Sequence, residues 1–178
     1  MEFHSTTILG LKYKDQVAMG GDGQVTFGDT ILKSKAIKIR KMYDDQILAG
    51  FAGAVADAMA LFERFEQKID EFTGNLPRAT VELAKEWRTD KYLQKLEALL
   101  AVADQNHTYL IAGTGEVVEP DDGLLAIGSG GPYALAAARA IIASKPKLSA
   151  ADIVRKSLEI AADICVYTNN SITVETIT

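Results

Sequence analysis

The sequence is poor in the residues that thiol and metal chemistry require. Its 178 residues include one cysteine, Cys165, and two histidines, His4 and His107. A single cysteine excludes an internal disulfide framework and is typical of a reducing compartment, so we expect a cytoplasmic protein. Neither an HExxH nor a CxxC spacing occurs, which excludes the common zinc motifs. If the chain is a hydrolase, its general base is expected to be a group other than histidine.

Long apolar runs and an excess of positive charge are missing as well. No apolar run approaches the roughly 20 residues of a membrane span, and residues 1–5 lack the basic start and apolar core of a signal peptide. The 24 acidic and 19 basic residues leave a net charge of −5, which argues against nucleic acid as the main partner. We therefore expect neither a membrane nor a nucleic acid as partner.

The apolar periodicity predicts one domain with two groups of strands and two pairs of helices. Strands are expected at 6–14, 16–19, 26–33, 38–42, 47–51, 99–103, 108–112, 117–118, 124–127 and 172–177, and helices at 54–72, from 77 to at least 87, at 132–143 and at 149–167. Regular alternation of strand and helix is absent, so a doubly wound parallel sheet is not expected. The order instead predicts an α+β fold of two stacked sheets, each covered on its outside by helices.

The start of the chain carries the most informative chemistry. Two adjacent threonines, Thr6 and Thr7, begin the first predicted strand, and Asp22 follows between two glycines. If the chain is cut between Ser5 and Thr6, one residue carries both a hydroxyl and a free α-amine. Such an amine titrates near 7.7–8.0 and can take the hydroxyl proton, which makes the threonine a nucleophile. The alternatives are that both threonines merely begin a strand, or that Ser5 is the nucleophile.

Six motifs, in order and with matching spacing, resemble the HslV (ClpQ) family. These are proteasome-like peptidases of ATP-dependent proteases and belong to the N-terminal-nucleophile hydrolases. The motifs lie at 6–8, 21–24, 49–53, 83–90, 128–134 and 164–169. The resemblance extends from Thr6 to about Ile177 and implies a four-layer αββα sandwich of two antiparallel sheets. It also implies a short propeptide, residues 1–5, before a single peptidase domain, residues 6–178.

The resemblance assigns a role to each of five residues. Thr6 is the nucleophile that forms an acyl-enzyme, Lys38 lowers the pKa of its α-amine, and Asp22 pairs with Lys38. Gly50 supplies a backbone N–H for the oxyanion, and Ser129 supports the proton path.

The residues themselves leave alternatives open for three of these assignments. Lys38 lies in a basic run typical of an exposed strand edge, and Asp22 could be an ordinary turn aspartate. The glycine-rich loop around Ser129 could bind phosphate ahead of a helix, although it lacks the lysine of a P-loop.

The resemblance further implies partners and a cation. A Na⁺ ion is expected at the carbonyls of Ala162, Cys165 and Thr168, the first of which is commonly glycine in relatives, and no organic cofactor is expected. The implied assembly is two stacked hexameric rings, capped by an HslU-type ATPase that uses the ATP and delivers unfolded protein substrates. The alternatives are a catalytically silent ring subunit of the same fold and a nucleotide-binding module built on the Ser129 loop.

Overall fold

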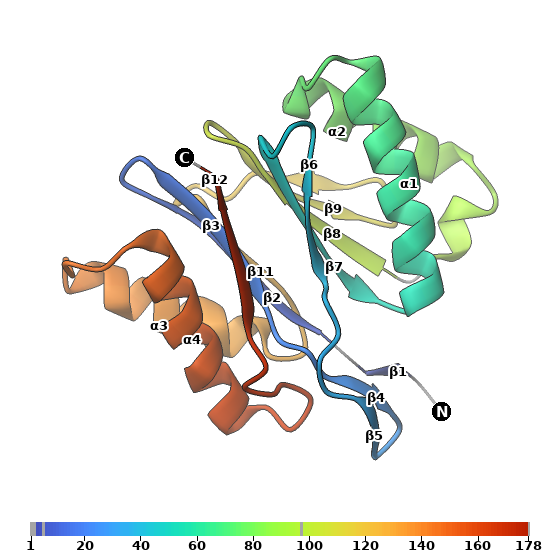
Figure 1. Cartoon of the computed structure of the whole chain (residues 1–178). Coiled ribbons are helices and arrows are strands. Elements are labelled where there is room, and N and C mark those ends of the chain that lie inside the picture. Colours follow the sequence, from blue (N-terminus) through green and yellow to red (C-terminus); the bar gives the residue numbers. More distant parts are fainter. Residues whose placement is uncertain (1–2, 5, 97, 178) are drawn as a thin grey trace.

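The computed structural model describes residues 3–4, 6–96 and 98–177 and arranges them in four main layers (Figure 1). A five-stranded sheet has the order β10-β9-β8-β7-β6, and a four-stranded sheet has the order β11-β2-β3-β12. All neighbouring strands are antiparallel. Helices α1 and α2 cover the first sheet, and α3 and α4 cover the second. The predicted αββα sandwich is therefore confirmed.

The bounds of the elements follow the predicted order closely. The five-stranded sheet consists of β6 (Ile39–Met42), β7 (Ile47–Gly53), β8 (Ala98–Ala103), β9 (Thr108–Ala112) and β10 (Val117–Val118). The four-stranded sheet consists of β2 (Thr7–Tyr13), β3 (Gln16–Gly21), β11 (Leu124–Gly128) and β12 (Thr173–Ile177). The helices are α1 (Val55–Glu71), α2 (Leu76–Thr89), α3 (Gly131–Ala143) and α4 (Ala150–Ile164), with a 3₁₀ turn at Leu93–Lys95. A third sheet has the order β1-β4-β5, from β1 (Phe3–His4), β4 (Val25–Phe27) and β5 (Thr30–Lys33).

Apolar side chains fill all three spaces between the layers. Phe62 and Trp87 belong to the cluster between the α1–α2 pair and the five-stranded sheet. Ile8 and Met19 lie between the two sheets, and Leu158 lies between α4 and the four-stranded sheet. Strands such as β7 are buried on both faces, because apolar layers lie on either side of them. None of the helices among the described residues combines the length and apolarity that a membrane span needs.

Two predicted boundaries are wrong for identifiable reasons. The helix predicted at 149–167 begins as expected, with a capping box between Ser149 and Asp152, but it ends at Ile164. Cys165 is its C-cap in an extended conformation, not a mid-helix residue as its apolar neighbours suggested. The strand predicted at 26–33 is the hairpin of β4 and β5, because a turn with a positive φ at Gly28 interrupts it. Apolar patterning does not register a two-residue turn.

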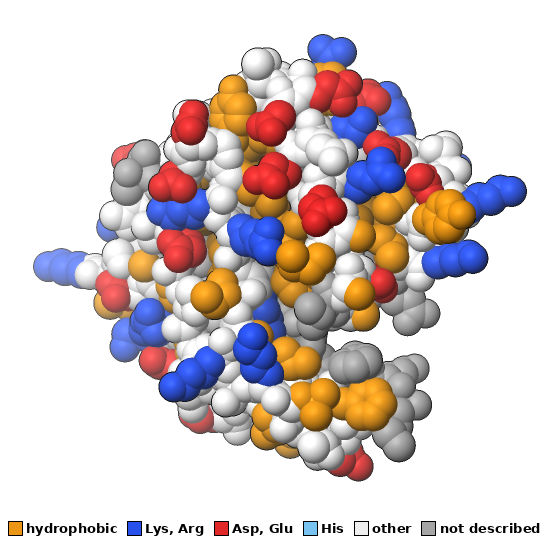
Figure 2. All heavy atoms as spheres, turned by 45° about the vertical axis from the view of Figure 1, so that its right-hand side comes forward, with side chains coloured by type: hydrophobic (Ala, Val, Ile, Leu, Met, Phe, Trp, Pro, Cys, Tyr) orange, Lys and Arg blue, Asp and Glu red, His pale blue; other side chains and the backbone are white. Residues whose placement is uncertain are grey.

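The β4–β5 hairpin projects from the sandwich (Figure 1). Figure 2 shows this lower part of the molecule separated from the body by a notch. Two apolar side chains of β5, Ile31 and Leu32, are 58% and 59% exposed, and Ile37 just beyond the hairpin is 75% exposed. The hairpin therefore presents apolar surface outside the three core clusters.

The close approach of α4 to β3 depends on Gly20. A Cβ at this position would lie 2.4 Å from Val154 Cγ1 and 2.8 Å from Leu158 Cδ1. We expect Gly20→Ala to lower the free energy of unfolding by about 1–3 kcal/mol, because a packed core accepts extra volume only by shifting. The measurement is the urea unfolding midpoint. Gly10→Ala on the neighbouring strand is the control, since its nearest contact is the flexible end of Met19 at 3.1 Å; equal losses in the two variants would contradict the prediction.

Candidate active site

The peptide unit between Thr6 and Thr7 is held at both of its polar ends. The Thr6 carbonyl accepts a hydrogen bond from the Ser129 N–H at 3.0 Å. The Thr7 N–H donates to Asp22 Oδ1 at 2.8 Å, and the Thr7 carbonyl accepts from the Asp22 N–H at 3.2 Å. Thr6 lies just before β2 and is 1% exposed. The orientation of Thr6 is therefore fixed from its C-terminal side.

Thr6 adopts an unusual backbone conformation. Its φ is 117°, a value that a β-branched residue rarely takes and that costs roughly 1–3 kcal/mol. The end of β11 approaches it closely, since a Cβ at Gly128 would lie 1.8 Å from the Thr6 carbonyl oxygen. Gly128 itself has a φ of 86°. The Thr6 conformation is thus stabilised by neighbouring backbone that only a glycine at position 128 allows.

The Thr6 hydroxyl is buried and has no hydrogen-bond partner within the described part of the chain. Buried hydroxyls are nearly always bonded, and an exception calls for an explanation. A hydroxyl kept free of structural bonds is available for reaction. The hydroxyl of Thr80 in α2 is also buried without a partner, so the missing bond fits a nucleophile at Thr6 but does not identify one by itself.

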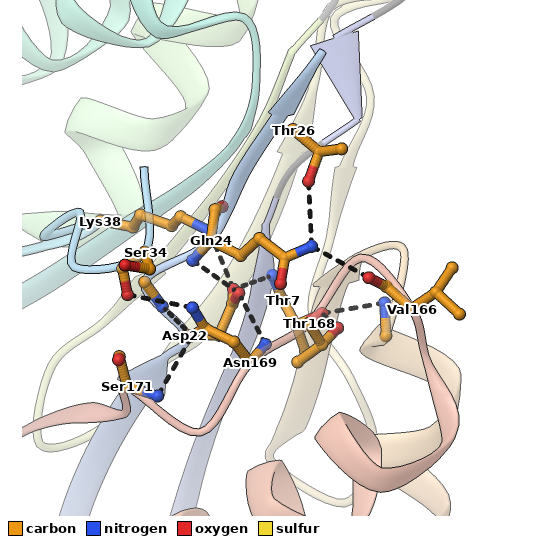
Figure 3. A network of polar contacts seen from close by, with 12 residues as sticks. Thr7, Asp22, Gln24, Thr26, Ser34, Lys38, Val166, Thr168, Asn169 and Ser171 are labelled. Atoms are coloured by element: carbon orange, nitrogen blue, oxygen red, sulfur yellow. Dashed lines mark hydrogen bonds and ion pairs between the residues drawn. The ribbon is translucent and has the colours of Figure 1, made fainter. Parts of the chain in front are cut away.

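Lys38 and Asp22 form a buried ion pair next to this peptide unit (Figure 3). The Lys38 Nζ donates to Asp22 Oδ1 at 2.8 Å and to the Gln24 carbonyl at 2.6 Å. Asp22 Oδ1 thus accepts from both Lys38 and the Thr7 N–H, which places the ammonium beside the Thr6–Thr7 peptide. Burial lowers the pKa of Lys38, while the charge of Asp22 and its hydrogen bond act in the opposite direction.

Lys38 differs from the rest of its basic run. It lies directly before β6 and is 3% exposed, whereas the neighbouring basic residues, Lys33, Lys35, Arg40 and Lys41, are exposed. The alternative that Lys38 belongs to an exposed strand edge is therefore wrong. A lysine that is buried needs a partner of opposite charge, and Asp22 supplies it.

Asp22 is more than a turn residue. Its second carboxylate oxygen, Oδ2, accepts from the Gln24 N–H at 2.9 Å and from the Asn169 N–H at 3.3 Å. The Asn169 side chain adds further contacts, accepting from the Gly23 N–H at 3.1 Å and donating to the Ser34 carbonyl at 3.0 Å. Asn169 is the last residue of the motif at 164–169, which was the only sequence signal for these contacts.

Thr7 is a second residue whose contribution the sequence did not reveal. Its hydroxyl lies 2.7 Å from the Thr168 hydroxyl and accepts from the Gly130 N–H at 2.9 Å. These bonds join β2 to the loop before α3 and to the segment after α4. Ser129 contacts Thr6 through its main-chain N–H, while the predicted role of its side chain in the proton path stays a prediction.

Gly50 lies within β7, opposite Ile39 of β6 and Ala101 of β8. A Cβ there would be 3.0 Å from Ile8 Cγ2, so the glycine suits the tight space between the sheets. β6 begins at Ile39, which pairs with Gly50. Among the described residues, the part of β7 after Gly50 therefore pairs with β8 alone. The part of β7 from Phe51 to Gly53 therefore leaves one edge open beside Lys38. The oxyanion role of Gly50 itself stays a prediction.

The three residues expected to hold a cation lie around the end of α4. Ala162 is in its last turn, Cys165 is its C-cap, and the Thr168 N–H donates to the Cys165 carbonyl at 3.0 Å. A carbonyl oxygen has two lone pairs, so this bond leaves the Cys165 oxygen able to bind a cation as well. The residues are compatible with a carbonyl site.

Comparison with known proteins identifies the family of the chain. The family model of proteasome subunits matches residues 2–177. The chain is 58% identical over 176 residues to the ATP-dependent protease subunit HslV of Oceanobacillus iheyensis, covering 98% of this chain and 97% of the relative. It is 59% identical over 177 residues to the HslV subunit of Pseudothermotoga lettingae, covering 99% and 100%.

Solved structures show the same relationship. The crystal structure of eukaryotic HslV from Trypanosoma brucei has a TM-score of 0.90 and 48% identity, covering 96% of this chain and 98% of that one. Thiobacillus denitrificans BPH, at 19% identity and a TM-score of 0.73 over 96% of this chain and 97% of that one, shares the fold. The chain therefore belongs to the proteasome subunit family and, within it, to the HslV threonine peptidase subunits of ATP-dependent proteases.

Proposed function

We propose that Thr6 is the nucleophile of this peptidase and that Lys38, Asp22, Gly50 and Ser129 assist it. The observation that carries the proposal is the buried Lys38–Asp22 pair, whose Asp22 Oδ1 also accepts from the Thr7 N–H, while the hydroxyl of the adjacent residue, Thr6, has no partner among the described residues. A catalytically silent subunit would not need to keep a buried charge pair next to an unbonded hydroxyl.

The proposed reaction uses the α-amine of Thr6 as the base. Once residues 1–5 are removed, the amine takes the hydroxyl proton and Oγ1 attacks the peptide carbonyl. The ammonium of Lys38 keeps the amine neutral by lowering its pKa. The Gly50 N–H stabilises the oxyanion, and Ser129 supports proton transfer to the leaving amine. Water then hydrolyses the acyl-enzyme ester.

The strand that precedes Thr6 suggests how peptides bind. In β1, Phe3 and His4 pair with Phe27 and Thr26 of β4 as an added antiparallel strand. We propose that residues 1–5 form a propeptide ahead of the peptidase domain, residues 6–178, and that substrates occupy the same edge of β4 after its removal. Pairing along a strand edge requires an extended peptide, which suits unfolded protein as the substrate.

The proposed assembly is a pair of stacked hexameric rings in the cytoplasm that works with an HslU-type ATPase. The relatives from Oceanobacillus iheyensis and Pseudothermotoga lettingae are subunits of ATP-dependent proteases, and in this proposal the partner ATPase binds and hydrolyses the ATP. The exposed apolar side chains Ile31, Leu32 and Ile37 support burial of the β4–β5 hairpin in an assembly, since such patches commonly mark contact surfaces.

We further propose that the carbonyls of Ala162, Cys165 and Thr168 bind Na⁺, with no organic cofactor. A hard cation prefers oxygen ligands, and three main-chain carbonyls around one turn provide them. The ion would supply a positive charge that stabilises the turn between α4 and Thr168. Thr168 in turn holds the Thr7 hydroxyl.

Thr6→Ala is expected to abolish peptide hydrolysis, because it removes the hydroxyl that attacks the peptide carbonyl in the proposed reaction. The free energy of unfolding should change little, since the lost hydroxyl has no partner and its loss removes no hydrogen bond. Peptidase assays and urea unfolding test both statements. Thr6→Ser is the matched control and should retain activity; turnover in Thr6→Ala would exclude Thr6 as the nucleophile.

Lys38→Ala is expected to reduce activity by at least 10²-fold and to destabilise the fold by about 3–5 kcal/mol, because Asp22 is left as an unpaired buried charge. Lys41→Ala is the matched control in the same basic run. Lys41 is exposed, and its ion pair with Glu175 is a surface pair at a long distance of 3.8 Å. It should be close to wild type in both measurements. Equal activity in the two variants would show that Lys38 has no catalytic role.

The N-terminal sequence of purified active enzyme is expected to begin at Thr6. With residue 5 still attached, the Thr6 nitrogen is an amide and cannot act as a base. If Thr6 cuts the preceding bond itself, Lys38→Ala should retain residues 1–5, whereas Lys41→Ala should be processed normally. Active enzyme that begins at Ser5 would move the nucleophile to that serine, and one that begins at Met1 or Glu2 would exclude the amine mechanism.

A further inference from the structure

We propose that the side chain of Gln24 is a positioning residue for the reaction. It holds the Lys38 ammonium in place by anchoring the backbone that binds this ammonium to β4, which follows it directly, and to the distant segment after α4. The inference rests on the proposed function, because it concerns the activation of Thr6.

The backbone of Gln24 contacts both members of the ion pair. Its carbonyl accepts from Lys38 Nζ at 2.6 Å, and its N–H donates to Asp22 Oδ2 at 2.9 Å. A lysine ammonium has three N–H groups. Asp22 Oδ1 and the Gln24 carbonyl direct two of them, and together they fix the direction of the third. A shift of the Gln24 backbone therefore moves the ammonium and the carboxylate together.

The side chain of Gln24 provides the anchor. The residue is 3% exposed, and its Nε2 donates to the Val166 carbonyl at 2.9 Å and to Thr26 Oγ1 at 3.0 Å (Figure 3). Val166 belongs to the segment after α4, and Thr26 belongs to β4. The two N–H groups of this buried amide thus donate to acceptors from different parts of the chain.

This anchor matters because residues 22–24 lie outside the strand ladders. They connect β3, which ends at Gly21, to β4, which begins at Val25. Gly23 within this connection has wide conformational freedom, although its N–H is bound by Asn169. The Asp22 N–H also donates to the Thr7 carbonyl, and the Gly23 carbonyl accepts from the Ala36 N–H at 2.9 Å. The Gln24 amide adds a side-chain contact to these, at the residue whose carbonyl binds Lys38.

The contact with Thr26 links the anchor to peptide binding. Thr26 is the residue of β4 that pairs with His4 of β1. The same amide therefore connects the strand edge proposed for substrates to the ion pair beside the nucleophile. Loss of this amide is expected to loosen the ammonium and to move its charge away from the Thr6 amine. The pKa of the amine then rises, and activity is lost on the acidic side of the pH profile.

The test uses Gln24→Met, which keeps an unbranched side chain of similar length without the amide. Enzyme is reacted with a small β-lactone that has no peptide part, so that the rate of Thr6 acylation reports activation without substrate binding. Rates are normalised to the fraction of chains that begin at Thr6, counted by intact mass. Gln16→Met is the matched control, because Gln16 also bonds a backbone group, the Ala150 N–H at 3.0 Å, but far from the site.

We expect Gln24→Met to acylate about tenfold more slowly at pH 7 and its acidic limb to move up by about one pH unit, since the amine loses part of its charged neighbour. Gln16→Met should remain within about twofold of wild type. Thr26→Val removes one of the two acceptors and should change both quantities in the same direction by less. It carries the test if Gln24→Met does not fold.

The inference would be overturned if Gln24→Met had the same acylation rate and the same acidic limb as wild type. It would also be overturned if Gln16→Met lost as much acylation rate as Gln24→Met. Both results leave the proposed function intact, provided that wild-type enzyme forms the adduct on Thr6. Absence of that adduct in wild type would instead overturn the proposed function, and this inference with it.

Discussion

The structure depends on one buried negative charge, the Asp22 carboxylate. It accepts hydrogen bonds from the Thr7 N–H and Lys38 Nζ at Oδ1, and from the Gln24 and Asn169 N–H groups at Oδ2. A carboxylate that is 1% exposed is costly to bury unless its lone pairs are used in this way. The four donors come from the start of β2, the residue before β6, the connection after β3 and the segment after α4. Satisfying one charge therefore brings three other parts of the chain to the connection that carries Asp22.

The stacked sheets make this convergence possible. The head of β2 lies opposite the end of β11, with Thr7 paired to Gly128. On the other sheet, Ile39 at the start of β6 pairs with Gly50, and the chain just before Ile39 carries Lys38. Ile8 packs between the sheets close enough to Gly50 that a Cβ there would lie 3.0 Å from Ile8 Cγ2. The proposed nucleophile, Thr6, and Lys38 are thus supplied by different sheets, and the packing between the sheets sets their distance.

The sequence allowed the layers to be predicted because apolar periodicity records which faces are buried. It also predicted a general base other than histidine, since only His4 and His107 occur. The hydrogen bonds of Thr7, Gln24 and Asn169 could not be predicted in this way, because a side-chain bond across more than 100 residues leaves no periodic signal. The end of α4 was missed for a related reason. Its apolar pattern continues beyond Ile164, while the backbone turns to place Thr168 beside Thr7.

The site is assembled in the uncleaved chain. The Thr6 carbonyl, the Thr7 N–H and the Thr7 hydroxyl already have their partners, and the Thr6 hydroxyl is already unbonded within the described residues. In the proposed mechanism, removal of residues 1–5 changes the chemistry of a single nitrogen, from an amide to an amine. Among the described residues, β1 pairs only with β4, in the small sheet outside the four layers. Its removal would therefore break none of the described bonds that orient Thr6, and the proposed activation would need no refolding.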